Sequence, residues 1–392
     1  MRQLATLQKI QTLEPIPEKD RIVLAKFDNV GWSVIVGKDD FKVRDLAIYY
    51  EIDSLLPPEP CYEFLRKRCF NEKWQGHRIR SMKMGQIYSE GLVLPLTAVS
   101  YDLTKYHEGD DVTDLLKIRK YDPEALAEQK LLEQRKKKYG PVMRFLLRIP
   151  FIKYLLYPKR SRTQFPKWAH MSDETSVQVL PYVYEDYKGV KVYVTEKLDG
   201  QSALFGVVGR EFVVCSRRMR LPALGKIKGK YVAEKNNYWK SAEKFDIERK
   251  LRLAQKELGI DLYVQGEQCG PSISGNRVKW TELKFYIFNI YDVTHAKYFA
   301  FEDMVSFCAK YGFEMVPLLE VTDFKWENVD VLIAYAKGNS VITNTELREG
   351  IVIRSYEPKQ PGRGMAGQAS FKVINPDFDL KWHGAGVKEE EE

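Results

Sequence analysis

The feature that most constrains this chain is a lysine at the end of a β-branched run, followed at once by an acid and a glycine. The run extends from Val192 to Thr195, and the tetrad is Lys197-Leu198-Asp199-Gly200. β-Branched residues favour an extended strand that can deliver the lysine stem into a pocket, and glycine lets the backbone turn or approach a ligand closely. The stretch therefore offers an amine nucleophile and a carboxylate within a few residues. For the tetrad alone, a solvated lysine at a strand end stays open as the alternative.

Further charged residues follow at the ends of other strand-like runs downstream. The segments are Ser216-Arg217-Arg218, Gly266-Glu267-Gln268-Cys269-Gly270, Phe285 to Ile290, Glu349-Gly350-Ile351-Val352-Ile353-Arg354 and Ser370-Phe371-Lys372-Val373. Each acid or lysine taken singly is typical of a solvated strand end. Together with the tetrad they supply an amine, several carboxylates, an arginine and a second lysine. These are the groups needed to handle a triphosphate with a divalent metal.

In order and spacing, these six segments resemble the motifs of the covalent nucleotidyltransferases, which comprise ATP-dependent RNA and DNA ligases and mRNA capping enzymes. The stretch from Gly266 to Arg277, with Cys269-Gly270-Pro271 and Asn276-Arg277, resembles RNA ligases rather than DNA ligases. The N-terminal third is similar to the OB module that precedes the catalytic domain in Deinococcus-type RNA ligases. The resemblance covers nearly the whole chain. It implies an α+β fold in which an N-terminal OB-like β-barrel is followed by an adenylyltransferase (ATP-grasp-like ligase) domain.

The resemblance also implies roles for the motif residues. Lys197 would be the catalytic nucleophile that carries AMP, and a bound metal, Lys372 and partial burial are expected to lower the pKa of its amine. Three carboxylates would hold Mg²⁺ or Mn²⁺, mostly through its waters: Asp199, Glu267 and Glu349. The residues expected to contact ATP are Glu196, Arg217, Glu267, Phe288, Glu349 and Lys372.

Several of these contacts can be specified further by the same resemblance. Phe288 would stack on adenine, Glu196 would lie beside the adenine edge, and Lys372 would contact the α-phosphate. Arg217 would meet the ribose or the 5′-phosphate of the nucleic acid, and Glu267 has the ribose hydroxyls as an alternative partner.

The last motif departs from the family pattern. Many RNA ligases carry Lys-x-Lys there, whereas the second lysine is replaced by Ile374 in this chain. Either Lys372 acts alone, or Lys381 supplies the second positive charge.

The length and the charge distribution suggest several domains. The chain has 392 residues and a net charge of +8, which is long enough for two or three domains with ample core. The excess positive charge belongs to one segment, because the residues from Lys130 to Lys167 include twelve Lys/Arg and one Glu. We expect an OB-like nucleic-acid-binding domain at 1–123, a basic helical linker at 124–171, an adenylyltransferase (RNA ligase) catalytic domain at 172–386 and an acidic tail at 387–392.

The basic segment indicates the class of partner. Such a segment suits phosphate backbones, whose condensed counterions are released on contact. A solvated basic linker is the alternative. A membrane surface is a third interpretation, because the apolar stretches Phe145-Leu146-Leu147 and Tyr154-Leu155-Leu156-Tyr157 are interleaved with Arg148 and Lys153. Pro150 would interrupt a long interfacial helix there, so we expect nucleic acid and no membrane as the partner.

The hydrophobic pattern predicts elements in both domains. Strands are expected at Val30–Gly37, Leu46–Ile52 and Gly91–Leu96, with a helix at Glu63–Lys67. Several short strands in about 120 residues suggest a small barrel. Helices are also expected at 124–140, Ala242–Leu258, Phe301–Lys310 and Asn328–Lys337. OB barrels bind nucleic acid through basic and aromatic residues, for which the candidates are Tyr62, Trp74, Arg78 and Arg80; alternatively this module only supports the catalytic domain.

Cysteine usage and hydropathy bear on the compartment. The five cysteines form no Cys-x-x-Cys pair, the five histidines are scattered, and no run of 18 apolar residues occurs. This pattern argues for a reducing compartment and against a structural zinc or a membrane span. We expect a cytoplasmic monomer.

Taken together, the residues and the resemblance predict an ATP-dependent RNA ligase that uses ATP and Mg²⁺ (or Mn²⁺). It would form lysyl-AMP, transfer AMP to a 5′-phosphate and join that end to a 3′-OH. The expected partner is RNA with these ends in a nicked duplex, as in RNA repair. A DNA or mixed RNA/DNA nick ligase is one alternative. A nucleic-acid-binding protein with an inactive transferase domain is another, although the intact lysine and acids argue against it.

Overall fold

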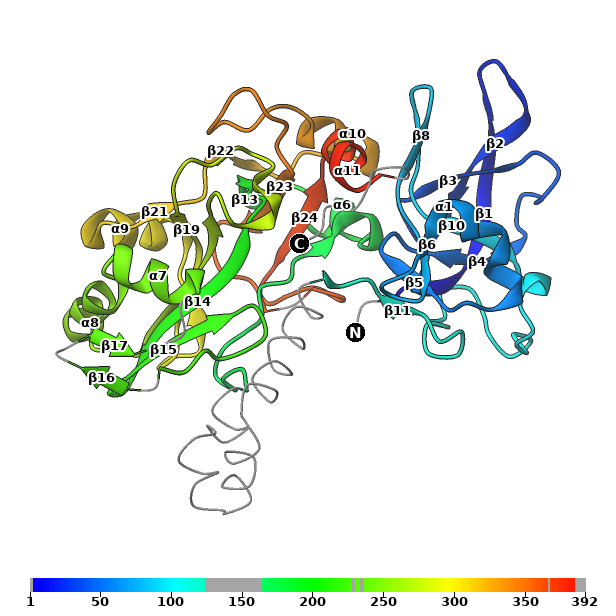
Figure 1. Cartoon of the computed structure of the whole chain (residues 1–392). Coiled ribbons are helices and arrows are strands. Elements are labelled where there is room, and N and C mark those ends of the chain that lie inside the picture. Colours follow the sequence, from blue (N-terminus) through cyan, green and yellow to red (C-terminus); the bar gives the residue numbers. More distant parts are fainter. Residues whose placement is uncertain are drawn as a thin grey trace, which may run out of the picture. The chain divides into compact units, whose positions relative to one another are not determined.

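Antiparallel sheets form the framework of both units into which the chain folds in the computed structural model (Figure 1). The structure describes residues 3–123, 164–223, 225–227, 230–232, 236–365 and 367–384. The first unit gathers the described residues 3–123, 177–181 and 376–384, and the second gathers 164–176 and 182–375. The predicted domains are each one continuous range, whereas the first unit also includes residues 177–181 and 376–384 from the later part of the chain. Most of the predicted basic linker, residues 124–163, and its helix at 124–140 lie outside the described residues.

The first unit is built around the long strand β1 (Ala5–Ile16), which pairs with β2 on one side and with β4 on the other. Its five-stranded sheet has the order β10-β4-β1-β2-β3, and a four-stranded sheet has the order β11-β5-β7-β6. The strands are β1 (Ala5–Ile16), β2 (Lys19–Phe27), β3 (Ser33–Gly37), β4 (Leu46–Tyr50), β5 (Ser54–Leu56), β6 (Phe70–Asn71), β7 (Gly76–Arg78), β8 (Met82–Met84), β9 (Ile87–Ser89), β10 (Leu92–Pro95) and β11 (Arg119–Lys120). The predicted strands at Val30–Gly37, Leu46–Ile52 and Gly91–Leu96 are confirmed as β3, β4 and β10.

Alternation along β4 divides the core of this unit into two clusters. Ile48 and Tyr50 pack in one cluster, and Ala47 and Tyr49 pack in the other. This is the outcome expected for a strand, because successive side chains point to opposite faces. Tyr62 lies inside the first cluster, fully buried, and its hydroxyl lies 3.0 Å from that of Tyr50. The prediction that Tyr62 forms a platform for nucleic acid is therefore wrong.

Two mainly antiparallel sheets form the second unit, each with one parallel pair, β12 with β24 and β19 with β21. The five-stranded sheet has the order β12-β24-β23-β13-β22, and the six-stranded sheet has the order β15-β14-β18-β19-β20 with β21 on β19. Their strands are β12 (Thr175–Ser176), β13 (Lys191–Lys197), β14 (Gln201–Val208), β15 (Glu211–Ser216), β18 (Leu262–Cys269), β19 (Lys284–Asp292), β20 (Lys297–Tyr298), β21 (Glu314–Met315), β22 (Leu318–Asp323), β23 (Gly350–Ser355) and β24 (Ser370–Ile374). A separate hairpin pairs β16 (Gly225–Ile227) with β17 (Lys230–Val232).

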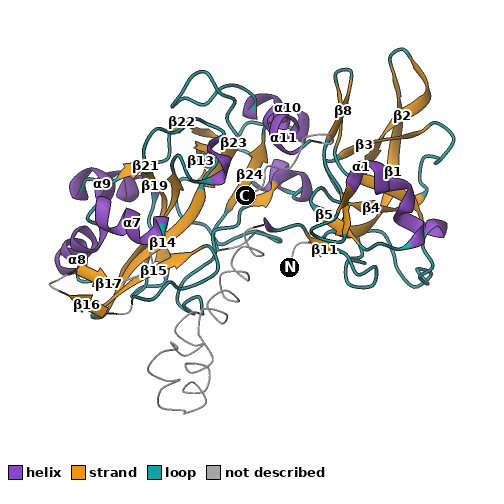
Figure 2. Ribbon diagram, viewed as in Figure 1, coloured by secondary structure: helices purple, strands orange, loops and turns teal. Residues whose placement is uncertain are grey.

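Helices cover the six-stranded sheet on one face (Figure 2). The helices and 3₁₀ turns of the described chain are η1 (Pro60–Leu65), α1 (Arg66–Cys69), η2 (Leu96–Ala98), η3 (Val177–Val179), α6 (Val183–Asp186), α7 (Asn237–Lys244), α8 (Ile247–Leu258), η4 (Ser274–Asn276), α9 (Phe301–Tyr311), α10 (Val329–Ala336) and α11 (Pro376–His383). Residues of α7, α8 and α9 pack with β14, β18 and β19 in one cluster. Within the described ranges, none of the helices is long and apolar enough to cross a membrane.

Four predicted helices can be compared with this result. The one at Glu63–Lys67 is divided between the 3₁₀ turn η1 and the short helix α1. Those at Phe301–Lys310 and Asn328–Lys337 are confirmed as α9 and α10. The expected single helix at Ala242–Leu258 is instead two helices, because Asp246 adopts the left-handed conformation with φ of 52° between α7 and α8. A non-glycine residue in that conformation ends the helical hydrogen-bond pattern.

One glycine fixes the register around which the second unit is arranged. Gly350 opens β23, pairs with Lys197 of β13 on one side and pairs with Ile374 of β24 on the other. Its φ is 156°, and a Cβ atom at this position would lie 2.2 Å from the carbonyl oxygen of Val373. Only glycine allows the two neighbouring strands to approach so closely.

We predict that Gly350→Ala lowers stability by about 2 kcal/mol through backbone strain and the clash with β24. Gly209→Ala is the matched control, because Gly209 also has a positive φ (55°) but no atom lies within 4 Å of the added methyl group. The control should cost about 1 kcal/mol. Thermal melting of both variants checks this, and equal melting temperatures would contradict the close-approach argument.

Candidate active site

The site is organised around the amine of Lys197, which ends β13. Its Nζ donates a hydrogen bond of 2.6 Å to Oε1 of Glu349, the residue just before β23. The two side chains are 24% and 17% exposed. Pairing of Lys197 with Gly350 across the two strands brings the amine and the carboxylate together. The sequence therefore places both partners correctly at strand ends.

The carboxylates around Lys197 hold its amine in the charged form. Burial by itself lowers the pKa of Lys197, but the charges of Glu349, Glu267 and Asp199, with the hydrogen bond to Glu349, outweigh burial and raise it. The lowering expected from sequence depended on a metal, on Lys372 and on partial burial, of which burial acts in that direction here. Activation of the amine therefore requires positive charge that the carboxylates do not supply.

Asp199 is the second acid of the site, and it has an internal cation as partner. Nη1 of Arg277 donates to Oδ1 and Oδ2 of Asp199 at 3.1 and 3.2 Å. The side chains of Arg277 and Asp199 are 18% and 10% exposed. Burial and the charge of Glu349 raise the pKa of Asp199, while the Arg277 guanidinium opposes that rise. Asp199 and Glu349 thus repel each other, and Arg277 offsets part of the repulsion.

A strained turn holds Arg277 in place. Ser274 and Asn276, on either side of a glycine, both have a φ of 49°. Residues in that region cost about 1–3 kcal/mol each and persist only where side chains fix them. The Ser274 hydroxyl donates to the Gly200 carbonyl oxygen at 2.7 Å. The Asn276 amide exchanges hydrogen bonds of 2.6 and 3.0 Å with the backbone of Trp280. The turn is therefore tied directly to the Lys197-Leu198-Asp199-Gly200 tetrad.

Arg277 is a site residue whose role was not predicted. The only signal in the sequence was that Asn276-Arg277 belongs to the stretch resembling RNA ligases. No periodicity indicates that its guanidinium reaches Asp199, because the turn is irregular.

The three acids suit a divalent cation held through water. Oε2 of Glu349 is buried and accepts no hydrogen bond. Burial is the largest cause that raises the pKa of Cys269, and the charges of Glu267, Asp199 and Glu349 raise it further. All three acids therefore lie near Cys269. Across the described part of the chain, however, no three Asp, Glu, His or Cys side chains are close enough to ligate an ion directly. Contacts through the waters of Mg²⁺ fit both observations.

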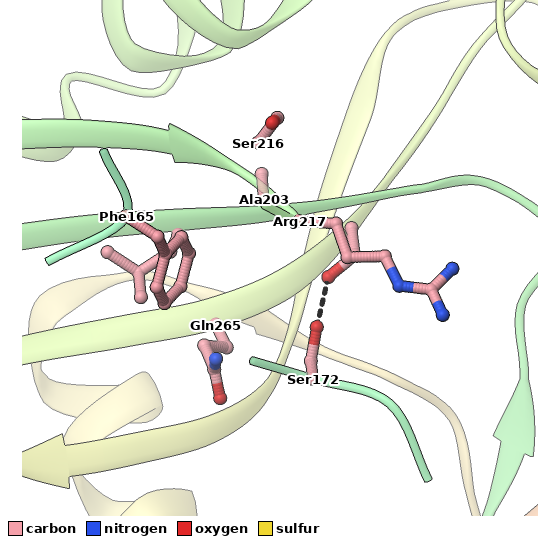
Figure 3. A pocket seen from close by; sticks show the side chains of 8 residues that line it. Phe165, Ser172, Ala203, Ser216, Arg217 and Gln265 are labelled. Carbon is pink, nitrogen blue, oxygen red and sulfur yellow. Dashed lines mark hydrogen bonds between the residues drawn. The ribbon is translucent and has the colours of Figure 1, made fainter. Parts of the chain in front are cut away.

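Two cations of separate motifs meet at one carboxylate. Nη2 of Arg217, just after β15, lies 2.7 Å from Oδ2 of Asp173, and Nζ of Lys372 on β24 lies 3.7 Å from Oδ1. Arg217 and Lys372, predicted to bind phosphate groups, are therefore brought to one place. A small pocket lies beside Arg217 (Figure 3), and its lining includes the hydroxyl groups of Ser172, Ser202 and Ser216.

The remaining predicted residues have these surroundings. Glu267 lies on β18 and acts on Lys197 through its charge. Phe288, on β19, is 7% exposed, and the Arg354 guanidinium carbon lies 5.4 Å from its ring centroid. Glu196 is buried and accepts a hydrogen bond from the backbone N–H of Val341 at 2.8 Å.

The candidate second lysine of the last motif belongs to a different unit. Lys381 lies on α11, whose residues cluster with the first unit, and its amine is 4.9 Å from the ring centroid of Trp382. Ile374, at the position where many RNA ligases have lysine, ends β24. Lys372 is therefore the lysine that the second unit supplies in this motif.

Lys197 lies among carboxylates, and Arg217 and Lys372 meet at Asp173. An amine nucleophile together with cations that can bind phosphate suits the transfer of a nucleotidyl group. Comparisons with known proteins specify the class. The RNA ligase family profile matches residues 190–374, and an OB-fold domain profile matches residues 4–96. These matches confirm the predicted fold, an N-terminal OB domain followed by a ligase domain. A search of curated proteins finds no match.

Solved structures of one protein are similar over almost the full length. They include Naegleria gruberi RNA ligase as a mutant with ATP and Mn, as another mutant with AMP and Mn, and with PPi. Each has 26% sequence identity and a TM-score of 0.75, and the matches cover 97%, 97% and 98% of this chain and 99% of each of the others. Residues 190–374 therefore match the RNA ligase family, and the chain is similar to an RNA ligase that has structures with ATP and with AMP.

We predict that Arg277→Gln destabilises the metal-free protein by about 3 kcal/mol, because it leaves a buried carboxylate without its cation. The double variant Arg277→Gln/Asp199→Asn should recover part of this loss, since both charges of the pair are gone. Millimolar MgCl₂ should raise the melting temperature of Arg277→Gln more than that of wild type. Melting with EDTA and with MgCl₂ checks both points. A double variant that melts no higher than Arg277→Gln would show that the pair is not a unit.

Proposed function

We propose that this protein is an RNA ligase of the Deinococcus type that joins RNA ends through lysyl-AMP on Lys197. The observation that carries the proposal is the hydrogen bond between Lys197 and Glu349, in a region that matches the RNA ligase family. The similar Naegleria gruberi protein has structures with ATP, AMP and PPi. These are the substrate and the products expected for such a reaction.

The proposed reaction has three transfers of phosphorus. The uncharged Lys197 amine attacks the α-phosphorus of ATP, so that an N–P bond forms and the bond to pyrophosphate breaks. An oxygen of the RNA 5′-phosphate then attacks the same phosphorus and releases the lysine. Finally the 3′-OH attacks the 5′-phosphate, loses its proton and displaces AMP. The residues contribute mainly by positioning and by charge, as is usual in phosphoryl transfer.

A divalent cation fits the acids of the site. Asp199, Glu267 and Glu349 would hold Mg²⁺ or Mn²⁺ through its waters, with the unpartnered Oε2 of Glu349 as one acceptor. When bound, the ion supplies the positive charge that lowers the pKa of the Lys197 amine and balances the charge of the leaving pyrophosphate. Glu349 orients the Lys197 amine across the pairing of β13 with β23 whether or not the ion is bound.

The cations of the site suit the phosphate groups of both substrates. Lys372 would contact the α-phosphate, and Arg217 would contact the ribose or the 5′-phosphate of RNA. We infer a nicked duplex as the substrate, as in RNA repair. The strongly basic composition of 130–167 supports nucleic acid as the partner, because phosphate contacts dominate its affinity.

We predict that Lys197→Ala abolishes transfer of label from α-labelled ATP to the protein, because the nucleophile is lost. Lys197→Arg should be equally inactive, since a guanidinium stays protonated. Both variants should still seal RNA that is already adenylylated, because that step needs no lysine nucleophile. Gel electrophoresis after incubation with ATP and MgCl₂ measures the first effect. Labelled Lys197→Ala protein would refute the mechanism, and unlabelled wild type would favour a binding protein with an inactive domain.

We also predict that a nick made of RNA is sealed faster than a nick made entirely of DNA, because residues 190–374 match the RNA ligase family. The comparison uses nicked duplexes in which one side at a time is RNA or DNA, at one salt concentration. Equal rates for all-DNA and all-RNA nicks would favour the alternative, a DNA or mixed nick ligase with the same chemistry.

A further inference from the structure

Asp173 is the carboxylate that Arg217 and Lys372 share, and it has no role in the reaction described above. It lies two residues before β12, while its partners come from the end of β15 and from β24. Its two oxygens face different cations, at 2.7 Å from Arg217 and 3.7 Å from Lys372. A carboxylate with one cation at each oxygen has the arrangement that a phosphate group adopts between two such side chains.

The residues on either side of Asp173 hold the backbone in place. The hydroxyl of Ser172 is hydrogen-bonded to that of Ser202 on β14, the contact drawn as a dashed line in Figure 3. On the other side, Oε1 of Glu174 pairs with Nη2 of Arg354 at 2.7 Å. That second pair is nearly buried, with side chains that are 15% and 3% exposed. The segment is therefore anchored on both sides of Asp173.

Exposure distinguishes Asp173 from its anchors and from its partners. Its side chain is 45% exposed, whereas Arg217 and Lys372 are 25% and 23% exposed. An ion pair that is open to water contributes little to stability, so losing the carboxylate costs the fold little. The two cations would remain on their strands. Displacement of Asp173 would thus leave a preformed site for an anion.

We propose that Asp173 is an internal anion that occupies a phosphate site formed by Arg217 and Lys372, and that a phosphate group of the substrate displaces it. This inference rests on the proposed function, because that function supplies the phosphate. A terminal phosphate carries about −1.5 to −2 charges near neutral pH, against one for the carboxylate. A terminal phosphate therefore brings more negative charge to the two cations than Asp173 does. Asp173 acts as a specificity-determining residue for the site.

The phosphate group can come from two sources, AMP or the 5′ end of RNA. The experiment compares each ligand with its phosphate-free counterpart: AMP with adenosine, and 5′-phosphorylated RNA with the same RNA ending in 5′-OH. The measured ratio is the Kd of the phosphate-free ligand divided by the Kd of the phosphorylated ligand, and it isolates the contribution of the phosphate group. Any general change in the charge of the protein affects both RNAs and cancels in the ratio. The full chain carries Lys197→Ala, so that binding is measured without reaction.

In this background, Asp173→Asn should raise the Kd ratio of at least one ligand pair by about tenfold, because one competing charge-assisted contact is removed. Asp173→Glu keeps the charge and should leave the ratio near its starting value. Asp303→Asn is the matched control, since it removes the same charge from an exposed position on α9. Adding Lys372→Ala to Asp173→Asn should abolish the gain. The pair that responds identifies the source of the phosphate.

An unchanged or smaller ratio for both ligand pairs in Asp173→Asn would overturn the inference. Tighter binding of both members of a pair by the same factor counts as an unchanged ratio. Asp173→Ser provides a second variant if the first one melts at a lower temperature than its parent. Failure of the proposed function gives a different result, which is wild-type protein that takes no label from α-labelled ATP. The binding ratios can be measured in either case.

Discussion

The pairing of β13 with β23 is the contact on which the site depends, because it sets Lys197 opposite Gly350 and so brings the amine to Glu349. The same ladder continues into β24, where Lys372 pairs with Val352. Lys197, Glu349 and Lys372 therefore lie on or directly beside three adjacent strands. A shift of one residue would turn these side chains to the opposite face of the sheet. The close approach at Gly350 prevents that shift, so a residue without a side chain determines the geometry of the charged ones.

The charges predicted to bind substrate or metal have internal partners in the described structure. The pairs are Lys197 with Glu349, Asp199 with Arg277, and both Arg217 and Lys372 with Asp173. Burying such groups without partners would be costly, and the pairs offset this cost before a ligand arrives. Under the proposed function, binding would be an exchange of ionic partners, and the pairs would keep the charged groups oriented until then.

Sequence was sufficient for the residues carried by regular strands. Lys197, Glu349 and Lys372 lie at or near the ends of apolar, β-branched runs, which indicate strands, and the family resemblance assigned their roles. Arg277 and Asp173 were not assigned a role, because they lie in irregular segments where no period sets the direction of a side chain. The same limit explains Asp246, whose left-handed backbone divides a helix that composition predicts as continuous. It also explains Tyr62, which pattern alone does not distinguish from a surface aromatic residue.

The repulsion between Asp199 and Glu349 has a consequence for the life of the molecule in a cell. Burial and mutual charge raise the pKa of Asp199, so the ligand-free protein holds two acids in a state that opposes its own folding. Any cation that settles between them stabilises the native state by mass action. Proteases remove chains in proportion to the fraction that is unfolded. Under the proposed function, a divalent cation would therefore add to the stability of the folded protein as well as take part in its reaction.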